Sequence, residues 1–241
     1  MLDVVLRALR HPFDYLPALY RRTLILQEVR QECPDVYSFI FKPTKPLVWK
    51  AGQHGIFYFP QTKIEGKWWR AFSIASSSHE GVVRISTIVK ETPSDFKKHL
   101  RELAIGDTIL MHGPFGEFYT TDRISRIVGI AGGIGITPFR ALIKDISLGV
   151  ITDTQLTLIY SAVAEYAYKE ELDLLAQHPA ITIIYTRTPE EVNTELSKQI
   201  EVQSNCASYF ISGSPGMITA IRKTLKEKGV RNIVNDSFKG Y

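Results

Sequence analysis

Apolar and polar residues alternate with a period of two over most of the first half of the chain. This alternation is typical of strands with one buried face, and it predicts strands at 36–41, 55–59, 82–89 and 108–111. Turn-forming stretches separate these strands. One short helix is expected over 94–103. Several short strands at this spacing favour a small antiparallel β-barrel, and we place that domain at 23–123.

After residue 123 the pattern changes. Apolar runs at 127–131, 156–160, 181–185 and 209–211 alternate with stretches of helical periodicity at 137–147, 165–177, 190–202 and 215–229. Such alternation is typical of parallel strands joined by crossover helices. We therefore expect a two-domain protein, in which an α/β domain with a parallel sheet follows the barrel over 124–241.

The first 22 residues form a separate segment. Apolar residues recur at helical spacing between Leu2 and Leu9, and Pro12 and Pro17 interrupt any longer helix. The segment fits two interpretations: an amphipathic helix that packs back on the body, or a peripheral anchor to a membrane or partner. It lacks the features of a secretory signal. The sequence contains no run of about 18 apolar residues, the length that would predict a membrane span.

A glycine-rich turn lies at 129–138, where the first apolar strand of the α/β domain ends and a helix begins. A pyrophosphate could approach its backbone closely, because three of its residues lack side chains: Gly132, Gly133 and Gly135. Thr137 is expected to cap the helix and Pro138 to be its first residue. The free N–H groups there favour an anion. The turn matches neither the G-x-G-x-x-G fingerprint nor a Walker P-loop, but its position favours nucleotide binding.

A second candidate site is the predicted strand that begins at Arg70. The guanidinium fork of Arg70 could pair with a pyrophosphate. Phe72 lies on the same strand face and offers a ring for stacking. Ser73 points to the opposite face unless the strand ends there.

Composition narrows the function classes. A formal net charge of +4 is too small to indicate nucleic-acid binding, but it suits anionic cofactors or an acidic protein partner. Two cysteines give no disulfide framework and exclude an internal four-thiolate iron–sulfur cluster. The six histidines form no ligand-spaced cluster, so we expect no metal site.

Taken together, these motifs resemble the ferredoxin–NADP⁺ reductase superfamily over nearly everything after residue 22. The matching elements stand in family order, at 52–53, 70–73, 88–90, 106–107, 113–116, 132–138, 212–217 and 236–241. The resemblance implies an FAD-binding barrel followed by an NAD(P)-binding α/β domain.

The resemblance also implies roles for residues around the flavin. Arg70 would hold the FAD pyrophosphate, Phe72 would pack on the flavin ring, and Ser73 would hydrogen-bond flavin N5. The remaining flavin contacts implied are Ala71, Ile88, Val89 and Lys90. Lys97 stands where the family usually places a Ser or Thr on the phosphate, and it could meet the phosphate as a point charge. A solvated lysine on the helix face is the alternative.

On the nicotinamide side, the implied contacts are the turn residues Gly132, Gly133, Gly135, Ile136 and Thr137, together with Gly213 and Met217. Ser212 replaces a cysteine that many relatives carry, and with Ser73 and Asp236 it completes the catalytic set that the resemblance implies. Phe238 is expected to cover the flavin face, with Tyr241 as the alternative. Thr186 and Arg187 resemble a pair that holds the 2′-phosphate of NADP, so NADP is preferred to NAD.

The implied function is a flavoenzyme that takes hydride from NAD(P)H and passes electrons to a separate acceptor. An acidic carrier such as ferredoxin or flavodoxin is favoured, and a ferric or flavin reductase is an alternative. A non-catalytic flavin- or nucleotide-binding subunit of a larger redox complex is another. We expect a cytoplasmic location, with peripheral membrane contact through 1–22 as the remaining option.

Overall fold

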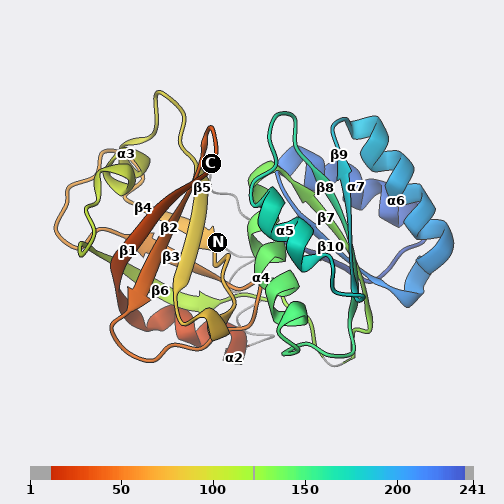
Figure 1. The fold of residues 1–241 in the computed structure, drawn as a ribbon, viewed down its shortest axis with the longest axis horizontal. Coiled ribbons are helices and arrows are strands. Elements are labelled where there is room, and N and C mark those ends of the chain that lie inside the picture. The colour runs from red at the N-terminus through yellow and green to blue at the C-terminus, as the bar shows by residue number, and fades with distance from the viewer. Residues whose placement is uncertain (1–11, 122, 237–241) are drawn as a thin grey trace.

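The computed structural model describes residues 12–121 and 123–236. Two sheets stand side by side, an antiparallel one in the first half of the chain and a parallel one in the second (Figure 1). This is the two-domain architecture that the change of hydrophobic period at residue 123 predicts.

The antiparallel sheet has the strand order β4-β3-β6-β1-β2-β5. Its strands are β1 (Arg21–Cys33), β2 (Val36–Pro43), β3 (His54–Tyr58), β4 (Trp69–Ser73), β5 (Val83–Ile88) and β6 (Thr108–Phe115). No ladder joins β4 to β5 within the described residues, so the curled sheet is an open half-barrel.

The core of the half-barrel consists of the inward residues of the alternating strands. Phe39 and Phe41 on β2, Phe57 on β3 and Ile85 on β5 are fully buried. Helix α3 (Asp95–Glu102) covers one end of the half-barrel and buries Phe96. The open edge between β4 and β5 faces the start of α4 and the end of β10 in the second domain.

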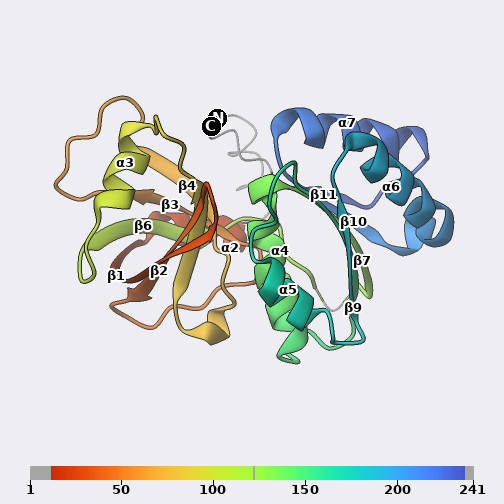
Figure 2. The ribbon, with the colours of Figure 1, turned by 45° about the horizontal axis from the view of Figure 1, so that its top comes forward.

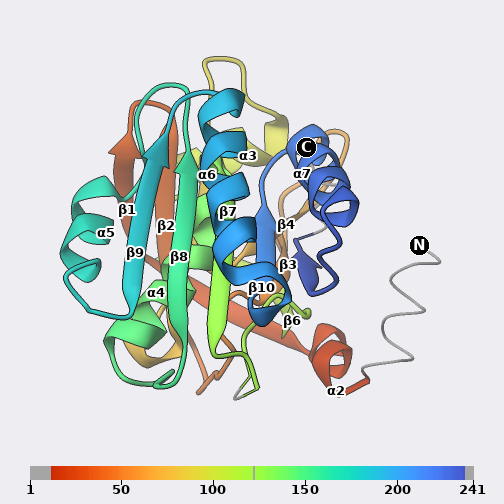
Figure 3. The same cartoon turned by 90° about the vertical axis from the view of Figure 1, so that its right-hand side faces the viewer.

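The parallel sheet has the order β11-β10-β7-β8-β9. Its strands are β7 (Arg126–Gly132), β8 (Gln155–Ser161), β9 (Ile181–Thr186), β10 (Ser208–Ser212) and β11 (Ile233–Asn235). Helices α4 (Ile136–Ser147) and α5 (Lys169–Leu175) lie between this sheet and the half-barrel, while α6 (Pro189–Gln203) and α7 (Pro215–Glu227) cover the far face (Figures 2 and 3).

Two helix starts differ from the sequence prediction. The cap of α4 is Gly135, and Thr137 is already the second helical residue. Its hydroxyl donates to the Ile134 carbonyl at 3.0 Å, so the prediction that Thr137 caps the helix is wrong. The helix expected at 165–177 begins only at Lys169, because Tyr168 has a left-handed backbone with φ 61°.

The described part of the N-terminal segment packs against the half-barrel. It forms α2 (Pro12–Tyr15) and the 3₁₀ turn η1 (Leu16–Leu19). Asp14 pairs with Lys50 at 3.1 Å and accepts a hydrogen bond from Tyr119 at 2.8 Å. The amphipathic stretch from Leu2 to Leu9 lies outside the described residues. Over the described ranges, no helix is long and apolar enough to cross a membrane.

Candidate functional site

A cavity of about 390 Å³ opens between the free edge of the half-barrel and the α/β domain. We call it the barrel cavity. β4 contributes Arg70, Ala71, Phe72 and Ser73 to its wall, and the opposite wall comes from the start of α4 and the end of β10. The strand that carries the arginine–aromatic–serine motif therefore lines a cavity, as the motif requires for ligand binding.

Three cationic side chains converge on the barrel cavity: Arg70, Lys90 and Lys97. None of them forms an ion pair with a carboxylate of the described residues. Burial, followed by the charges of Arg70 and Lys90, holds the pKa of Lys97 below its usual value. Burial also lowers the pKa of Arg70. An anion between these groups would relieve their mutual repulsion, so the site fits a pyrophosphate.

Two of the cations are held in place by backbone carbonyls. Lys97 donates to the Ile88 carbonyl at 2.8 Å, and Arg70 donates to the carbonyls of Lys67 and Trp69. The guanidinium of Arg70 also lies 5.4 Å from the centre of the Phe96 ring. These contacts hold both cationic side chains in place without neutralising their charge.

An aromatic wall continues from these cations. The Phe72 ring meets Phe57 edge-on with centroids 5.7 Å apart, and it lies 6.2 Å from Phe96. Phe72 itself is only half-buried and lines the cavity. A rigid ring with one face on the cavity suits a flat conjugated ligand.

Ser73, Ser212 and Asp236 meet at the inner end of the barrel cavity. Ser73 Oγ donates to Asp236 Oδ2 at 3.0 Å, and Ser212 also hydrogen-bonds the Asp236 carboxyl. Burial raises the pKa of Asp236 to about 8, against the opposing effect of these two hydrogen bonds. Near neutral pH the carboxyl therefore holds its proton. The structure brings the three residues together from β4, β10 and the segment after β11.

The glycine turn is closely packed at two of its three glycines. A Cβ on Gly135 would lie 2.2 Å from the carbonyl oxygen of Ser212, and one on Gly132 would lie 2.2 Å from Met217 Sδ. Gly133 instead faces open space, with φ 53°. Two glycines thus let the turn approach β10 and α7, and the third leaves backbone open for a ligand.

A larger cavity of about 910 Å³ lies on the other side of this turn. We call it the turn cavity. Gly132, Gly133, Met217 and Arg187 line it, and Cys33 contributes from the half-barrel. The barrel cavity and the turn cavity share three lining residues, Ile88, Lys90 and Ile134. The two cavities therefore adjoin each other at the domain interface.

Arg187 and Thr186 differ in their position relative to the turn cavity. Arg187 reaches the turn cavity with its guanidinium 4.2 Å from the centre of the Tyr166 ring, and it donates to the Ala162 carbonyl at 3.3 Å. Thr186 is buried, its hydroxyl directed at the Tyr160 carbonyl, and it lines neither cavity. Only Arg187 of the pair is placed to contact a ligand.

The other residues that the sequence analysis named also divide into those that line a cavity and those that are buried away from both cavities. Thr137 and Gly213 line the barrel cavity, whereas Val89 and Ile136 are buried in the cores and line neither cavity. Phe238 and Tyr241 lie outside the described residues. Sequence reasoning missed Ser86 and Thr87, which line the barrel cavity. The signal was two adjacent polar residues, Ser86 and Thr87, near the end of strand β5.

Within the described ranges, no group of three or more His, Cys, Asp or Glu residues could hold a metal ion.

An antiparallel half-barrel with a cation-lined cavity, adjoining a parallel sheet with a glycine turn, defines the class of two-domain proteins that bind a flavin and a nicotinamide nucleotide.

Family models match both halves of the chain. The model described as "Oxidoreductase FAD-binding domain" matches residues 23–119, and the "Oxidoreductase NAD-binding domain" matches 130–223. The chain belongs to the ferredoxin–NADP reductase-like superfamily of FAD- and NAD-binding oxidoreductases.

Among curated relatives, the NADH-cytochrome b5 reductase 1 of Mortierella alpina is 32% identical over 169 residues, which are 64% of this chain and 57% of the relative. A component of the Na(+)-translocating NADH-quinone reductase of Idiomarina loihiensis is 27% identical over 213 residues, 76% of this chain and 52% of the relative. The chain thus spans about half the length of these curated relatives.

Solved structures share the fold. The ferredoxin-NADP+ reductase of Plasmodium falciparum superposes with a TM-score of 0.75 at 17% identity, covering 91% of this chain and 98% of that one. The cytochrome b5 reductase domain of Ulva prolifera nitrate reductase gives a TM-score of 0.75 at 21% identity, covering 90% and 97%.

Proposed function

We propose that this protein is an FAD-dependent NAD(P)H oxidoreductase that passes electrons to a separate acceptor. The observation that supports this most strongly is the pair of adjoining cavities with the shared lining residues Ile88, Lys90 and Ile134. Hydride transfer requires two ring systems within near-attack distance, roughly 3–3.5 Å. Cavities that share a wall at the domain interface suit this requirement.

Each cavity has its own proposed ligand. Arg70, Lys90 and Lys97 would hold the FAD pyrophosphate, and Phe72 would support the flavin ring. Gly133 and the backbone of the glycine turn would receive the pyrophosphate of the nicotinamide nucleotide. When bound, FAD would supply the redox chemistry, which is hydride acceptance from reduced nicotinamide and single-electron release to the acceptor.

The chain's own contribution at the reacting end is the Ser73–Asp236–Ser212 cluster. Ser73 donates to Asp236, so its oxygen keeps free acceptor capacity toward the cavity. A protonated Asp236 adds no negative charge where the flavin would accumulate electrons. The cluster would therefore orient the ring and shield it from water at little electrostatic cost.

We propose NADP as the preferred nicotinamide, on the basis of Arg187. Its stacked guanidinium lines the turn cavity and has no carboxylate partner for its side chain among the described residues. A 2′-phosphate would provide one. The variant Arg187→Ala should raise the KM for NADPH at least tenfold while leaving the KM for NADH nearly unchanged. Arg231→Ala, at an exposed position in the same domain, is the matched control. Equal effects on both nucleotides would remove Arg187 from the site.

We propose an acidic protein carrier, such as ferredoxin or flavodoxin, as the acceptor. The net charge of +4 supports an acidic partner. The curated relatives include proteins named for cytochrome b5 and for quinone. Steady-state assays with ferredoxin, flavodoxin, cytochrome b5 and ferric citrate should give the highest kcat/KM with one of the two acidic carriers, and that value should fall as salt rises. Turnover with ferric citrate alone would contradict this assignment.

We also propose a cytoplasmic location. Cys33 and Cys206 are both free thiols, which suits a reducing compartment. Phe13 and Leu19 are 88% and 74% exposed, which supports an additional contact of the N-terminal segment with a membrane surface or a partner.

A further inference from the structure

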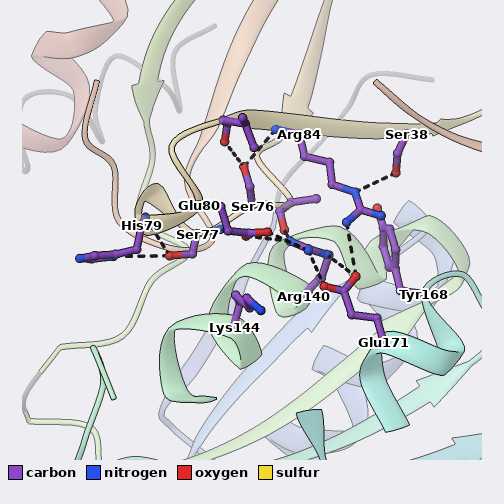
Figure 4. Close-up of polar contacts among 12 residues, drawn as sticks. Ser38, Ser76, Ser77, His79, Glu80, Arg84, Arg140, Lys144, Tyr168 and Glu171 are labelled. Atoms are coloured by element: carbon purple, nitrogen blue, oxygen red, sulfur yellow. Dashed lines mark hydrogen bonds and ion pairs between the residues drawn. The ribbon is translucent and has the colours of Figure 1, made fainter. Parts of the chain in front are cut away.

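A buried network of charged side chains crosses the domain interface outside both cavities. Figure 4 shows Arg84, from strand β5, and Arg140, from helix α4, converging on Glu171 of helix α5. The side chains of Arg84 and Arg140 are 5% and 2% exposed. Two buried guanidinium groups at an interface require a complete set of partners, since an unpaired buried charge is strongly destabilising.

Arg140 is bound from both domains at once. Its guanidinium donates to Glu80 Oε2 and Oε1 at 3.0 and 2.9 Å and to the Ala75 carbonyl at 2.7 Å, all three in the half-barrel. It also donates to Glu171 Oε2 at 3.0 Å within the α/β domain. Burial alone would lower the pKa of Arg140, but its bonds to Glu80 and Glu171 raise it above the ordinary value. The side chain is therefore a permanently charged link between the domains.

Arg84 makes the reciprocal link. It belongs to the half-barrel, pairs there with Glu32 and donates to Ser38 at 3.1 Å, and it reaches Glu171 across the interface at 3.3 Å. The ring of Tyr168 lies 4.7 Å from its guanidinium. The carboxylate of Glu171 therefore receives one arginine from each domain, and these two charges hold the pKa of Glu171 below its usual range although burial opposes them.

The network is connected to both cavities by short paths. The Ala75 carbonyl that Arg140 binds lies two residues beyond Ser73, which lines the barrel cavity. Arg140 itself lies about one helical turn after the glycine turn, on the helix that begins there. The Tyr168 hydroxyl donates to Ser86, another residue of the barrel cavity. A shift of Arg140 would thus move the glycine turn relative to Ser73.

We infer that Arg140 is a positioning residue, which fixes the two domains in the one orientation that aligns the turn cavity with the barrel cavity. This role rests on the proposed function, because alignment matters only if a hydride passes between the cavities. A helix–sheet contact through apolar side chains alone would permit sliding, whereas the three directional hydrogen bonds that the Arg140 fork donates across the interface, to Glu80 and Ala75, do not. Lysine cannot replace it, since a single ammonium cannot present the same fork.

The orientation can be measured without any bound cofactor. Nitroxide labels on the exposed native Cys206 and on a cysteine introduced at exposed Lys98, with Cys33→Ala, report the distance between the domains by pulsed electron resonance. We expect one narrow distance distribution for the labelled parent and a broadened or shifted one for Arg140→Met and Arg140→Lys. Lys198→Met, which breaks an exposed ion pair with Glu195 inside the α/β domain, should leave the distribution unchanged.

Flavin reduction is measured in parallel by rapid mixing with NADPH. Misplacement by about 1 Å costs on the order of a hundredfold in rate, so Arg140→Met should slow reduction ten- to a hundredfold, with less than a threefold change in the dissociation constant of NADPH. If Arg140→Met does not fold, Glu80→Gln serves instead, since glutamine can still accept the Ser77 backbone hydrogen bond that caps the turn at 78–80.

The outcomes separate the two claims. A narrow, unshifted distribution in a folded Arg140 variant would refute the role of Arg140. A broadened distribution with an unchanged reduction rate would refute its connection to hydride transfer. A parent protein that no nicotinamide reduces would refute the proposed function, while the distance measurement would still test the link between the domains.

Discussion

The buried carboxyl of Asp236 gives the sharpest prediction about stability. Its pKa is raised to about 8 in the folded protein, whereas an unfolded aspartate has a pKa of about 3.9. Between these values the folded chain binds a proton that the unfolded chain has released. The free energy of unfolding must therefore fall as pH rises through this window, by about 1.4 kcal/mol per pH unit. The stability is fully present below about pH 4 and is lost by about pH 8.

The variant Asp236→Asn removes this titration and keeps the shape of the side chain. As pH rises across the whole window, the difference in unfolding free energy, variant minus wild type, should grow by up to about 6 kcal/mol, of which the range from pH 5 to 8 covers about 4 kcal/mol. Urea unfolding at pH 5, 6, 7 and 8, at constant flavin content, measures that difference. Asp153→Asn, at an exposed position, should follow the wild-type profile. If the profiles of Asp236→Asn and wild type run parallel from pH 5 to 8, the burial argument is refuted.

Two further predictions concern the cavities. Gly135→Ala should lower the free energy of unfolding by about 1–3 kcal/mol, because its Cβ would lie 2.2 Å from the Ser212 carbonyl oxygen. The control is Gly216→Ala, where a Cβ meets open space and should leave the free energy of unfolding unchanged. Similar urea midpoints for the two variants would contradict tight packing at Gly135. Lys97→Met should weaken flavin binding about ten- to a hundredfold, as loss of a charged hydrogen bond of about 1.5–3 kcal/mol implies. Equilibrium dialysis against FAD measures this, with exposed Lys98→Met as the control; equal affinities would favour the solvated-lysine interpretation.

Periodicity predicted the architecture well where tertiary packing agrees with the local pattern. The apolar runs at 127–131, 156–160, 181–185 and 209–211 all lie in strands of the parallel sheet, because both of its faces are covered by helices. The long strand β1 carries no clear alternation after residue 26, where its register shifts, and it was not predicted.

The site was harder to predict than the fold. Motif position placed Arg70, Ser73 and Asp236 in one cavity, but it could not distinguish lining residues from their buried neighbours such as Val89, Ile136 and Thr186. Which side of a turn faces a cavity depends on contacts from the other domain. Long-range contacts also explain why the network of Arg84 and Arg140 could not be foreseen: its hydrogen-bonded partners lie as many as 87 positions apart in sequence.

The central claim is that a flavin in the barrel cavity meets a nicotinamide nucleotide in the turn cavity. Anaerobic titration of the purified protein with NADPH, and separately with NADH, tests it by visible absorbance. The account predicts a yellow protein whose flavin band is bleached by one equivalent of reduced nicotinamide per bound flavin. A flavin band that dithionite bleaches but neither nucleotide does would contradict it, and would favour a non-catalytic flavin-binding subunit.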